Sequence, residues 1–315
     1  FATSIIQTAD SGYVVVGARH DFTDFDGYAV KFDAYGNILW EQTYGGSGYD
    51  GLNSIIHTAD GGFLMSGTGM GDDYLMIKTD EFGNTQWSAG YGGTEGGEAN
   101  AAVETEDGGY VVAGYTWSDD GDVTGHHGYP DYWVIKLDSL GALQWQKAIG
   151  GGYFDWAYSM VKTNDGGYMV AGGTTGGGNM STSATASDYG IVKLDSLGNI
   201  LWTKLFGGSG SDGAYSMIAT NDGYVVAGSS NSNDRDVTGN HGSFDFWIMK
   251  FSDSTPETYF VDADHDGYGS ATTQLVCALT PPVGFATNSD DCNDNNANIH
   301  PGATEIINSV DDDCD

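Results

Sequence analysis

The chain has 315 residues, of which 39% are hydrophobic and 13% aromatic, enough to bury a sizeable core. It carries 44 acidic residues against 10 Lys and Arg, a formal net charge of −34. That charge excludes a surface that binds nucleic acid or anionic membranes, because phosphate groups would be repelled. No run of about 18 apolar residues is present, so we expect no membrane insertion. The chain opens at Phe1, inside a repeat, and we expect a mature or trimmed product.

One sequence unit recurs five times between Phe1 and about Ser254. Gly-Gly pairs mark it at residues 45, 92, 150 and 207, at spacings of 47, 58 and 57 residues. Each unit reads as four short strands rich in β-branched and aromatic residues, joined by turns of Gly, Asn and Asp. A period of roughly 40–50 residues with several short strands is typical of a β-propeller. An open β-solenoid, in which each unit stacks on the next, is the alternative.

The third unit shows the strands in chain order. The turn at Asp107 and its two glycines suits a tight hairpin, and a second strand is expected over 109–114. A third strand is expected over 131–138, after a long loop. The first three strands occur five times along the chain, whereas a fourth, Trp-bearing strand occurs four times, at Trp40, Trp87, Trp145 and Trp202.

We therefore predict an all-β fold, a β-propeller of at least five four-stranded blades, with the four Trp packed between blades. The missing fourth strand has two explanations. Either sequence before Phe1 supplies it, or the chain is a piece of a longer one.

A Lys recurs in every third strand, and these five residues are half of all the cations: Lys31, Lys78, Lys136, Lys193 and Lys250. We predict that they form ion pairs with the Asp two residues further on: Asp33, Asp80, Asp138 and Asp195. The fifth copy departs from this pattern, with Ser252 in place of the Asp. A group repeated five times is structural rather than catalytic, because a catalytic constellation occurs once.

The loop between the second and third strands is where function is most readily placed. Two long copies match, over 122–128 and 236–242, and each contains a His five residues after an Asp: His127 and His241. These two His either form a local Asp/Thr/His turn network or bind a metal or a sugar.

The repeat resembles the tandem β-propeller-like repeats of large secreted surface proteins of Bacteroidetes-type bacteria, which leave the cell by the type IX secretion route. Segments 131–138, 163–172 and 236–242 carry the resemblance, and the repeats cover about four-fifths of the chain. The resemblance implies secretion and display at the bacterial cell surface, and it implies no enzymatic activity. The C-terminal sorting domain of that family is not in this sequence, which agrees with a chain cut short.

The composition changes at Thr255 and Pro256, which sets the predicted domains at 1–254, a β-propeller repeat domain, and 255–315, an acidic calcium-binding module. The second segment holds 12 acidic residues, neither Lys nor Arg, and all three cysteines. Clustered cysteines and acids are typical of an oxidising, extracellular compartment. Cys277 and Cys292 are candidates for a disulfide that closes the loop between them.

The strongest chemical motif is Asp262, Asp264 and Asp266 followed by Gly267 and Tyr268. Oxygens at positions 1, 3 and 5, a Gly at 6 and a backbone carbonyl at 7 wrap a hard cation, as in an EF-hand loop. Position 12 is Thr273 instead of the closing Glu, so further ligands must come from the acidic clusters that follow. The predicted ligands of Ca²⁺ are Asp262, Asp264, Asp266, Tyr268, Asp290, Asp291, Asn293, Asn295, Glu305, Asp311 and Asp313. Without bound cations, this many acids in a small module would repel one another.

This segment also resembles the short metal-binding repeat of bacterial secreted proteins that is named after a copper-binding surface protein of methane oxidisers (MopE-like). The matching pieces lie over 262–269, 281–284, 291–296, 299–305 and 311–315. The family usually has a Cys where this chain has Ile307, which implies that Cys314 is free or joined to something beyond the chain. Copper does not transfer with the resemblance, since only His265 and His300 are soft enough ligands.

The favoured hypothesis is a secreted, non-enzymatic cell-surface protein that acts in adhesion or in a larger assembly and has a calcium-stabilised tail. Its expected partners are other cell-surface proteins or glycans. The alternative is a carbohydrate-binding or polysaccharide-degrading propeller, in which exposed aromatic rings stack on sugars: Trp117, Tyr129, Tyr153, Phe154 and Trp156. A glycosidase would need two carboxylates roughly 5–10 Å apart, and 44 acids do not identify such a pair.

Overall fold

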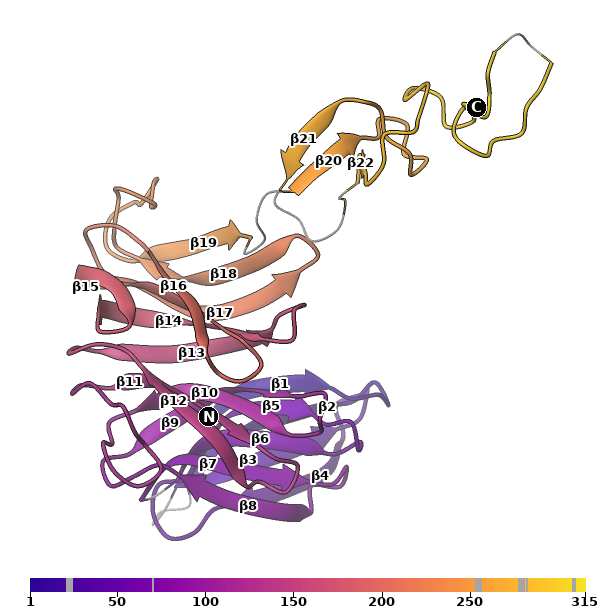
Figure 1. The fold of residues 1–315 in the computed structure, drawn as a ribbon. Coiled ribbons are helices and arrows are strands. Elements are labelled where there is room, and N and C mark those ends of the chain that lie inside the picture. The colour runs from indigo at the N-terminus through magenta and orange to yellow at the C-terminus, as the bar shows by residue number, and fades with distance from the viewer. Residues whose placement is uncertain (21–24, 70, 253–256, 277–280, 282, 308–309) are drawn as a thin grey trace. The chain divides into compact units, whose positions relative to one another are not determined.

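The computed structural model describes residues 1–20, 25–69, 71–252, 257–276, 281, 283–307 and 310–315. All of its regular elements are strands, β1 to β22, so the predicted all-β fold is confirmed (Figure 1). The chain divides into two compact units, Phe1–Met217 with Val226–Ile248, and Ile218–Val225 with Met249–Asp315. The boundary predicted from composition at residue 254 stays a prediction.

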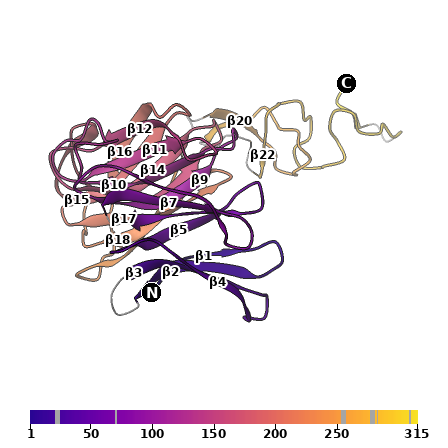
Figure 2. The same cartoon turned by 90° about the horizontal axis from the view of Figure 1, so that it is seen from below.

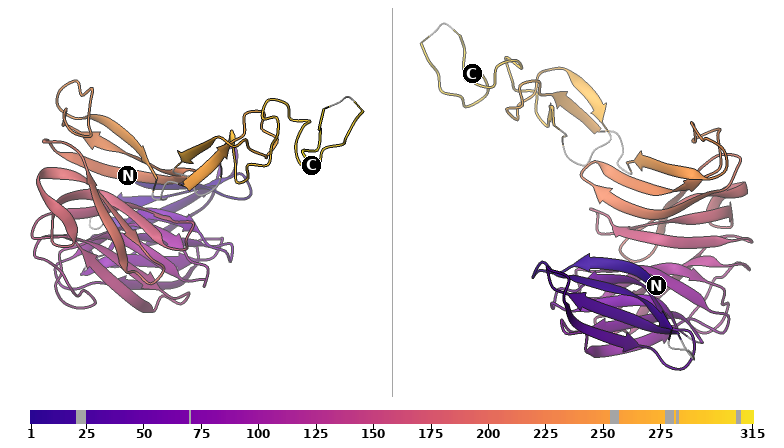
Figure 3. Two further views of the ribbon diagram at one scale, coloured as in Figure 1. Left: turned by 45° about the horizontal axis from the view of Figure 1, so that its top comes forward. Right: turned by 180° about the vertical axis from the view of Figure 1, so that it is seen from behind.

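Four consecutive antiparallel strands make each of four sheets, and their order in the sheet is their order in the chain. The first two sheets contain β1 (Ala2–Gln7), β2 (Tyr13–His20), β3 (Phe25–Phe32) and β4 (Ile38–Tyr44), then β5 (Gly51–His57), β6 (Phe63–Gly69), β7 (Asp72–Thr79) and β8 (Thr85–Tyr91). The next two contain β9 (Gly97–Glu104), β10 (Tyr110–Thr116), β11 (Asp131–Leu137) and β12 (Leu143–Ile149), then β13 (Asp155–Lys162), β14 (Tyr168–Gly177), β15 (Met180–Leu194) and β16 (Ile200–Phe206). The right panel of Figure 3 shows the first sheet in indigo, and Figure 2 shows β5 beside β1.

The fifth sheet contains β17 (Asp212–Thr220), β18 (Gly223–Ser230) and β19 (Asp245–Phe251), in that order. Within the described residues it has three strands, as the count of Trp-bearing strands predicted. Each sheet comes from one repeat, which is the arrangement of propeller blades.

The first hairpin turn of each blade explains the recurring Asp-Gly-Gly. In the second repeat the backbone N–H of Thr58 donates to the carbonyl of Gly62 at 3.1 Å, and its hydroxyl donates to Asp60 at 2.6 Å. Gly61 has φ of +88°, which an L side chain rarely adopts. A Cβ on Gly62 would lie 2.0 Å from the carbonyl oxygen of Thr79. Glycine is therefore required where β6 leaves the turn beside β7.

Successive blades are joined by a repeated tyrosine near the start of the third strand. The hydroxyl of Tyr132 donates to the carbonyl of Gly190 in the next blade at 3.1 Å, and that of Tyr189 donates to Trp247 at 2.8 Å. Tyr74 makes the same bond to Trp133 one blade earlier. These rings are fully buried, so each hydroxyl needs the partner that the neighbouring blade supplies.

The recurring Trp lies at the other end of the same interface, as predicted. Trp87 and Trp145 lie against Gly141 and Gly198 in the second turn of the following blade, where an added Cβ would come within 3.1 Å and 2.8 Å of the indole rings. The indole of Trp40 meets Gly83 in the same way. The side chains that pack between blades are therefore those that repeat in the sequence.

The recurring Lys pairs with a different Asp from the one predicted. Each ammonium lies 2.5–2.9 Å from a carboxylate in the first hairpin turn of its own blade, and the pairs are Lys31–Asp10, Lys78–Asp60, Lys136–Asp107, Lys193–Asp165 and Lys250–Asp222. Asp33 instead accepts the backbone N–H groups of Tyr35 and Asn37 in the second turn, and its counterparts Asp80, Asp138 and Asp195 do likewise. The prediction was wrong because the hairpin brings the turn Asp across the strand, whereas the Asp two residues on closes its own turn.

The second of the two compact units contains a small antiparallel sheet in which β20 (Glu257–Val261) lies between β21 (Thr273–Val276) and β22 (Phe285–Ala286). It is drawn in orange in the left panel of Figure 3. Cys292 is bonded to Cys314, with the Cα atoms 5.7 Å apart. This corrects the predicted bond from Cys292 to Cys277 and the expectation of a free Cys314, because one sulfur forms one disulfide. Cys277 itself lies outside the described residues.

Within the described part of the chain, no helix is long and apolar enough to span a membrane.

Candidate metal centre

The loop that follows β20 is closed by the carboxylate of Asp262. Its Oδ1 accepts the backbone N–H groups of His265 at 2.7 Å and Asp266 at 3.2 Å, and its Oδ2 accepts that of Gly267 at 3.1 Å. The backbone N–H of Asp262 donates to the carbonyl of Gly284 beside β22 at 3.0 Å. With 4% of its surface exposed, Asp262 fixes the turn that presents the next two acids.

Two groups of three carboxylates meet at Asp264. One consists of Asp262, Asp264 and Asp294, and the other of Asp264, Asp266 and Asp291. In each group, one ligand atom per residue can be chosen so that all three lie within 4.8 Å of one another. The spacing of the DxDxD motif therefore brings its acids together with the acids that follow Asn288.

Several oxygens at this centre are buried and have no protein partner. They are both carboxylate oxygens of Asp264 and the Oδ2 atoms of Asp266 and Asp291. The other oxygens of the last two are used, because Asp266 accepts the N–H of Tyr268 at 2.8 Å and Asp291 that of Asn293 at 2.7 Å. Buried polar atoms are almost always hydrogen-bonded or bound to an ion, so these oxygens fit a cation.

The electrostatics of this centre favour a bound cation. Burial raises the pKa of Asp291 above its ordinary value, and the nearby charges of Asp264, Asp266 and Asp294 raise it further, although the N–H of Asn293 opposes the shift. Residues 255–315 contain neither Lys nor Arg, so no side chain of that kind within the segment neutralises these acids.

A third group lies near the disulfide and contains Glu305, Asp311 and Asp313. Glu305 accepts the backbone N–H of Asp312 at 2.9 Å, which ties the two ends of this segment together. Burial and then the charges of Asp315, Glu305 and Asp311 raise the pKa of Asp313. Glu305 and Asp311 are exposed, so this group is more open to solvent than the two groups that share Asp264.

The remaining predicted ligands lie beside these groups but are not members of them. Tyr268 stacks its ring on that of His300, with centroids 5.1 Å apart. The backbone N–H of Asp290 donates to Asn288 at 3.4 Å, and that of Asn295 donates to the carbonyl of Asn293 at 2.6 Å. Their roles as ligands stay predictions. Asp294, which completes the first group, belongs to the acidic clusters from which further ligands were expected, although it is not among the ligands predicted by number.

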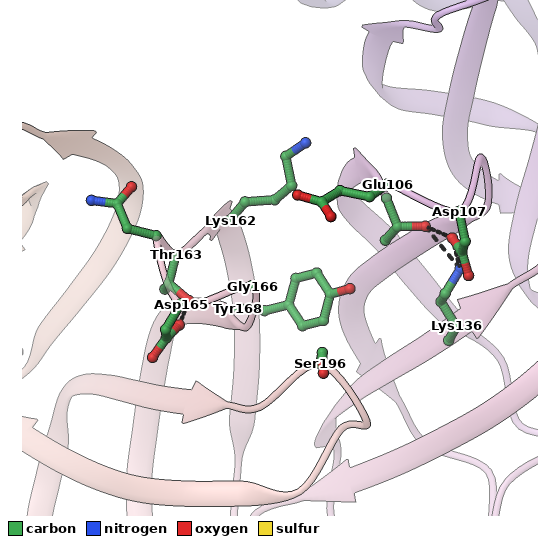
Figure 4. A pocket seen from close by; sticks show the side chains of 11 residues that line it. Glu106, Asp107, Lys136, Lys162, Thr163, Asp165, Gly166, Tyr168 and Ser196 are labelled. Carbon is green, nitrogen blue, oxygen red and sulfur yellow. Dashed lines mark hydrogen bonds and ion pairs between the residues drawn. The ribbon is translucent and has the colours of Figure 1, made fainter.

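A cavity of about 610 Å³ lies between the third and fourth blades, and charged residues line it (Figure 4). Lys136 lies in its wall and donates to Thr105 at 2.8 Å and to Asp107 at 2.9 Å. Figure 4 also shows Lys162, Glu106 and Ser196 among the residues that line the cavity. The ion pair in this cavity is the one that recurs in every blade, so it marks a blade motif rather than one catalytic centre.

The two His of the long loops make the local network that was one of the alternatives. The backbone N–H and the ring Nδ1 of His127 lie 2.9 Å and 2.8 Å from Asp131 Oδ2. His241 and Asp245 repeat the arrangement, with 2.6 Å and 3.1 Å. Each His therefore folds the loop back onto the start of the next strand.

A family model described as "Putative metal-binding motif" (Cu-binding_MopE) matches residues 291–315. No curated protein matches the chain. Three of the solved structures to which the chain is similar have identities of 8–15% and TM-scores of 0.37–0.43. Sqt1 from Chaetomium thermophilum is 15% identical over 73% of this chain and 66% of that one, with a TM-score of 0.37. An apocarotenoid oxygenase of Synechocystis is 12% identical over 72% of this chain and 55% of that one, with a TM-score of 0.40. The acylaminoacyl peptidase of Pyrococcus horikoshii is 8% identical over 83% of this chain and 40% of that one, with a TM-score of 0.43.

The chain thus spans less than two thirds of those proteins, and likeness at this level carries no functional argument. Taken together, the repeated sheets and the matched segment describe a β-propeller-like repeat protein with a metal-binding motif at residues 291–315.

Proposed function

We propose that this chain is a non-enzymatic component of a bacterial cell surface, in which the repeats form a rigid body for adhesion or assembly and Ca²⁺ stabilises the C-terminal module. The observation that carries the metal role is the environment of Asp264. Both of its carboxylate oxygens are buried and lack a protein partner, and the residue belongs to both groups of three carboxylates. Leaving such a side chain without a cation would cost several kcal/mol.

Calcium fits the donors better than other metals. All the members of the three groups are carboxylates, and Ca²⁺ takes six to eight oxygen ligands from flexible loops. Asp262, Asp264 and Asp294 would hold one ion, and Asp264, Asp266 and Asp291 a second. Copper and zinc prefer imidazole or thiolate, and none of the three groups found among the described residues contains a His or a Cys.

An extracellular location is supported by three features. A disulfide persists in oxidising compartments, the charge of −34 suits a soluble exported chain, and the repeat resembles those of secreted surface proteins. The repetition of the same side chains in every blade supports a structural role over catalysis. The partners that fit are other surface proteins or glycans.

The metal role is tested by thermal unfolding and calorimetric titration of the full chain after treatment with EDTA. We expect added Ca²⁺ at 100 times the Kd to stabilise the module by about 2.7 kcal/mol for each site that it fills. Asp264→Asn should abolish binding, whereas Asp119→Asn, which removes the same charge from an exposed loop of the repeats, should bind as the parent does. Unfolding that is identical in EDTA and Ca²⁺, or unchanged binding by Asp264→Asn, would show the proposal to be wrong.

A further inference from the structure

Five aromatic side chains from two neighbouring blades form one cluster, which we name the aromatic platform: Trp117, Tyr129, Tyr153, Phe154 and Trp156. Phe154 lies at its centre, with ring centroids 4.8 Å from Tyr129, 5.1 Å from Trp156 and 6.0 Å from Trp117. Tyr153 stacks on Tyr129 at 6.4 Å. Exposed fractions of 41% for Trp117, 46% for Tyr129 and 64% for Tyr153 leave three rings open to a ligand.

Backbone hydrogen bonds hold the platform in place. The N–H of Trp117 donates to Gly96 at 2.9 Å, that of Asp155 to Pro130 at 2.7 Å, and that of Thr175 to Phe154 at 3.1 Å. The loops that carry the rings are therefore tied to Gly96 just before β9, to β13 and to β14. A rigid platform binds a ligand without the entropic cost of ordering its own side chains.

The fifth repeat provides an internal comparison for the first of these loops. Its loop has the same backbone frame, because the N–H of Asn231 donates to Ser211 at 3.0 Å just as that of Trp117 donates to Gly96. Asn231 also stands at the position of Trp117, and Ser243 at that of Tyr129. The frame thus forms with small polar residues, and the two aromatic rings are not needed for the fold of the loop.

The connection between the third and fourth blades also folds without its aromatic rings. In the connection between the fourth and fifth blades, the positions of Tyr153, Phe154 and Trp156 are occupied by Gly210, Ser211 and Gly213. That connection still bonds Gly208 to Asp212 at 2.8 Å, as Gly151 bonds to Asp155 at 2.8 Å. Exposed aromatic surface that the fold does not require marks a contact site.

We propose that the aromatic platform binds a neutral polysaccharide. The faces of Trp and Tyr rings pack on the C–H faces of pyranose sugars, while their N–H and hydroxyl groups remain free to meet sugar hydroxyls at the rim. The adjoining loop contributes Asp119, Asp120 and Asp122, in a chain of net charge −34. These acids repel acidic glycans, and they would oppose each other if a second copy docked face to face.

The inference deepens the proposed function by naming the partner's chemistry, and it rests on that function for its adhesive role. It does not depend on the metal. Platform binding that persists in EDTA, with an unaffected Asp264→Asn variant, would support the inference even if the calcium role failed. Calcium binding without any glycan binding would overturn the inference alone.

The experiment is affinity electrophoresis and calorimetry of the full chain with soluble neutral polysaccharides (dextran, laminarin, arabinoxylan and galactomannan), with alginate as the anionic comparison. We expect binding to at least one neutral glycan and none to alginate. The double variant Trp117→Asn and Tyr129→Ser, which installs the residues of the fifth repeat, should weaken binding at least tenfold without lowering the thermal unfolding midpoint. Tyr35→Ser, which removes a 92% exposed ring elsewhere, should bind as the parent does.

Three results would overturn the proposal. The first is no binding to any of these neutral glycans, and the second is equal binding by the parent and the double variant. The third is a dimer in sedimentation experiments that the double variant abolishes, which would assign the platform to a second copy of the chain.

Discussion

Two buried carboxylates face each other where the third and fourth blades meet, and they predict a stabilising substitution. Asp131 and Asp155 are fully buried, and their Oδ1 and Oδ2 atoms lie 2.2 Å and 2.5 Å from the point where a Cβ on Gly150 would sit. Asp155 accepts hydrogen bonds from Thr174 and from the N–H of Gly151. Asp131 Oδ1 is buried and has no hydrogen-bond partner.

Burial raises the pKa of Asp155 to about 6 from 3.8, and the charge of Asp131 adds to the shift, although the bonds from Thr174 and Gly151 oppose it. A shift of roughly two units makes the ionised form about 3 kcal/mol less favourable in the folded state than in the unfolded chain. Because the folded pKa is raised, this destabilisation is fully present above pH 6. It fades as the pH falls through 6 towards 3.8.

We therefore expect Asp155→Asn to stabilise the repeats at pH 8 by up to about 3 kcal/mol, and by much less at pH 4. The amide keeps an acceptor oxygen for the hydroxyl of Thr174 and supplies an N–H for Asp131 Oδ1, but the N–H of Gly151 then loses its acceptor, so about 3 kcal/mol is an upper bound. The assay is thermal unfolding in EDTA between pH 4 and pH 8, where a gain of about 3 kcal/mol raises the Tm by roughly 6–12 °C in a domain of this size. Asp138→Asn, in an exposed turn, is the control and should show no such pH dependence.

A variant that is less stable than the parent at pH 8, or a gain that is equal at both pH values, would refute the reasoning. The next interface offers a repeat of the test. Burial and then the charge of Asp212 raise the pKa of Asp188 to about 6, and both carboxylates border Gly207. Asp188→Asn should therefore behave in the same way.

Three further predictions concern the turns, the disulfide and the ion pairs. Gly141→Ala should cost about 1–2 kcal/mol more than Gly166→Ala in urea unfolding, because both have positive φ but only at Gly141 would a Cβ meet Trp87, at 3.1 Å. Cys314→Ser should cost the C-terminal module about 3 kcal/mol and speed its digestion by thermolysin, whereas equal rates would argue against the Cys292–Cys314 bond. The bond from Thr105 and the ammonium of Lys136 lower the pKa of Asp107 to about 2. The stability that this shift contributes is present above pH 3.8 and is lost as the pH falls through 2. In Asp107→Asn the free energy of unfolding should therefore fall less between pH 3.8 and pH 2 than in the parent, by less than about 1 kcal/mol.

The repeated sheets could be predicted because strand, turn and core residues recur in register. Each third strand repeats an aromatic near its start and a Lys near its end, so one unit checks the interpretation of the others. The partner of that Lys was predicted wrongly, although the sequence held the correct signal. The fifth repeat lacks an Asp at position 252 but keeps Asp222 in its turn, and Lys250 pairs with Asp222.

The C-terminal module could be predicted only in part because it occurs once. Three cysteines allow three pairings, and their spacing does not choose among them. The DxDxD spacing predicted that Asp262, Asp264 and Asp266 lie together, but which of the later acids join them depends on how the segment after β22 folds back. The aromatic platform was foreseen as a set of rings, whereas its assembly requires the contact between blades that brings Phe154 beside Tyr129.

The buried ion pairs also affect how proteases meet this chain. Trypsin-like enzymes cut after Lys or Arg in an accessible, extended segment, and the chain contains only 10 such residues. Four of them, Lys31, Lys78, Lys136 and Lys193, have side chains only 3–13% exposed and held by a carboxylate within a sheet. The segment from residue 251 to residue 315 contains none. A protease of this specificity therefore finds few places to cut, and in the first four blades the Lys side chains that join the strands are also protected from cleavage.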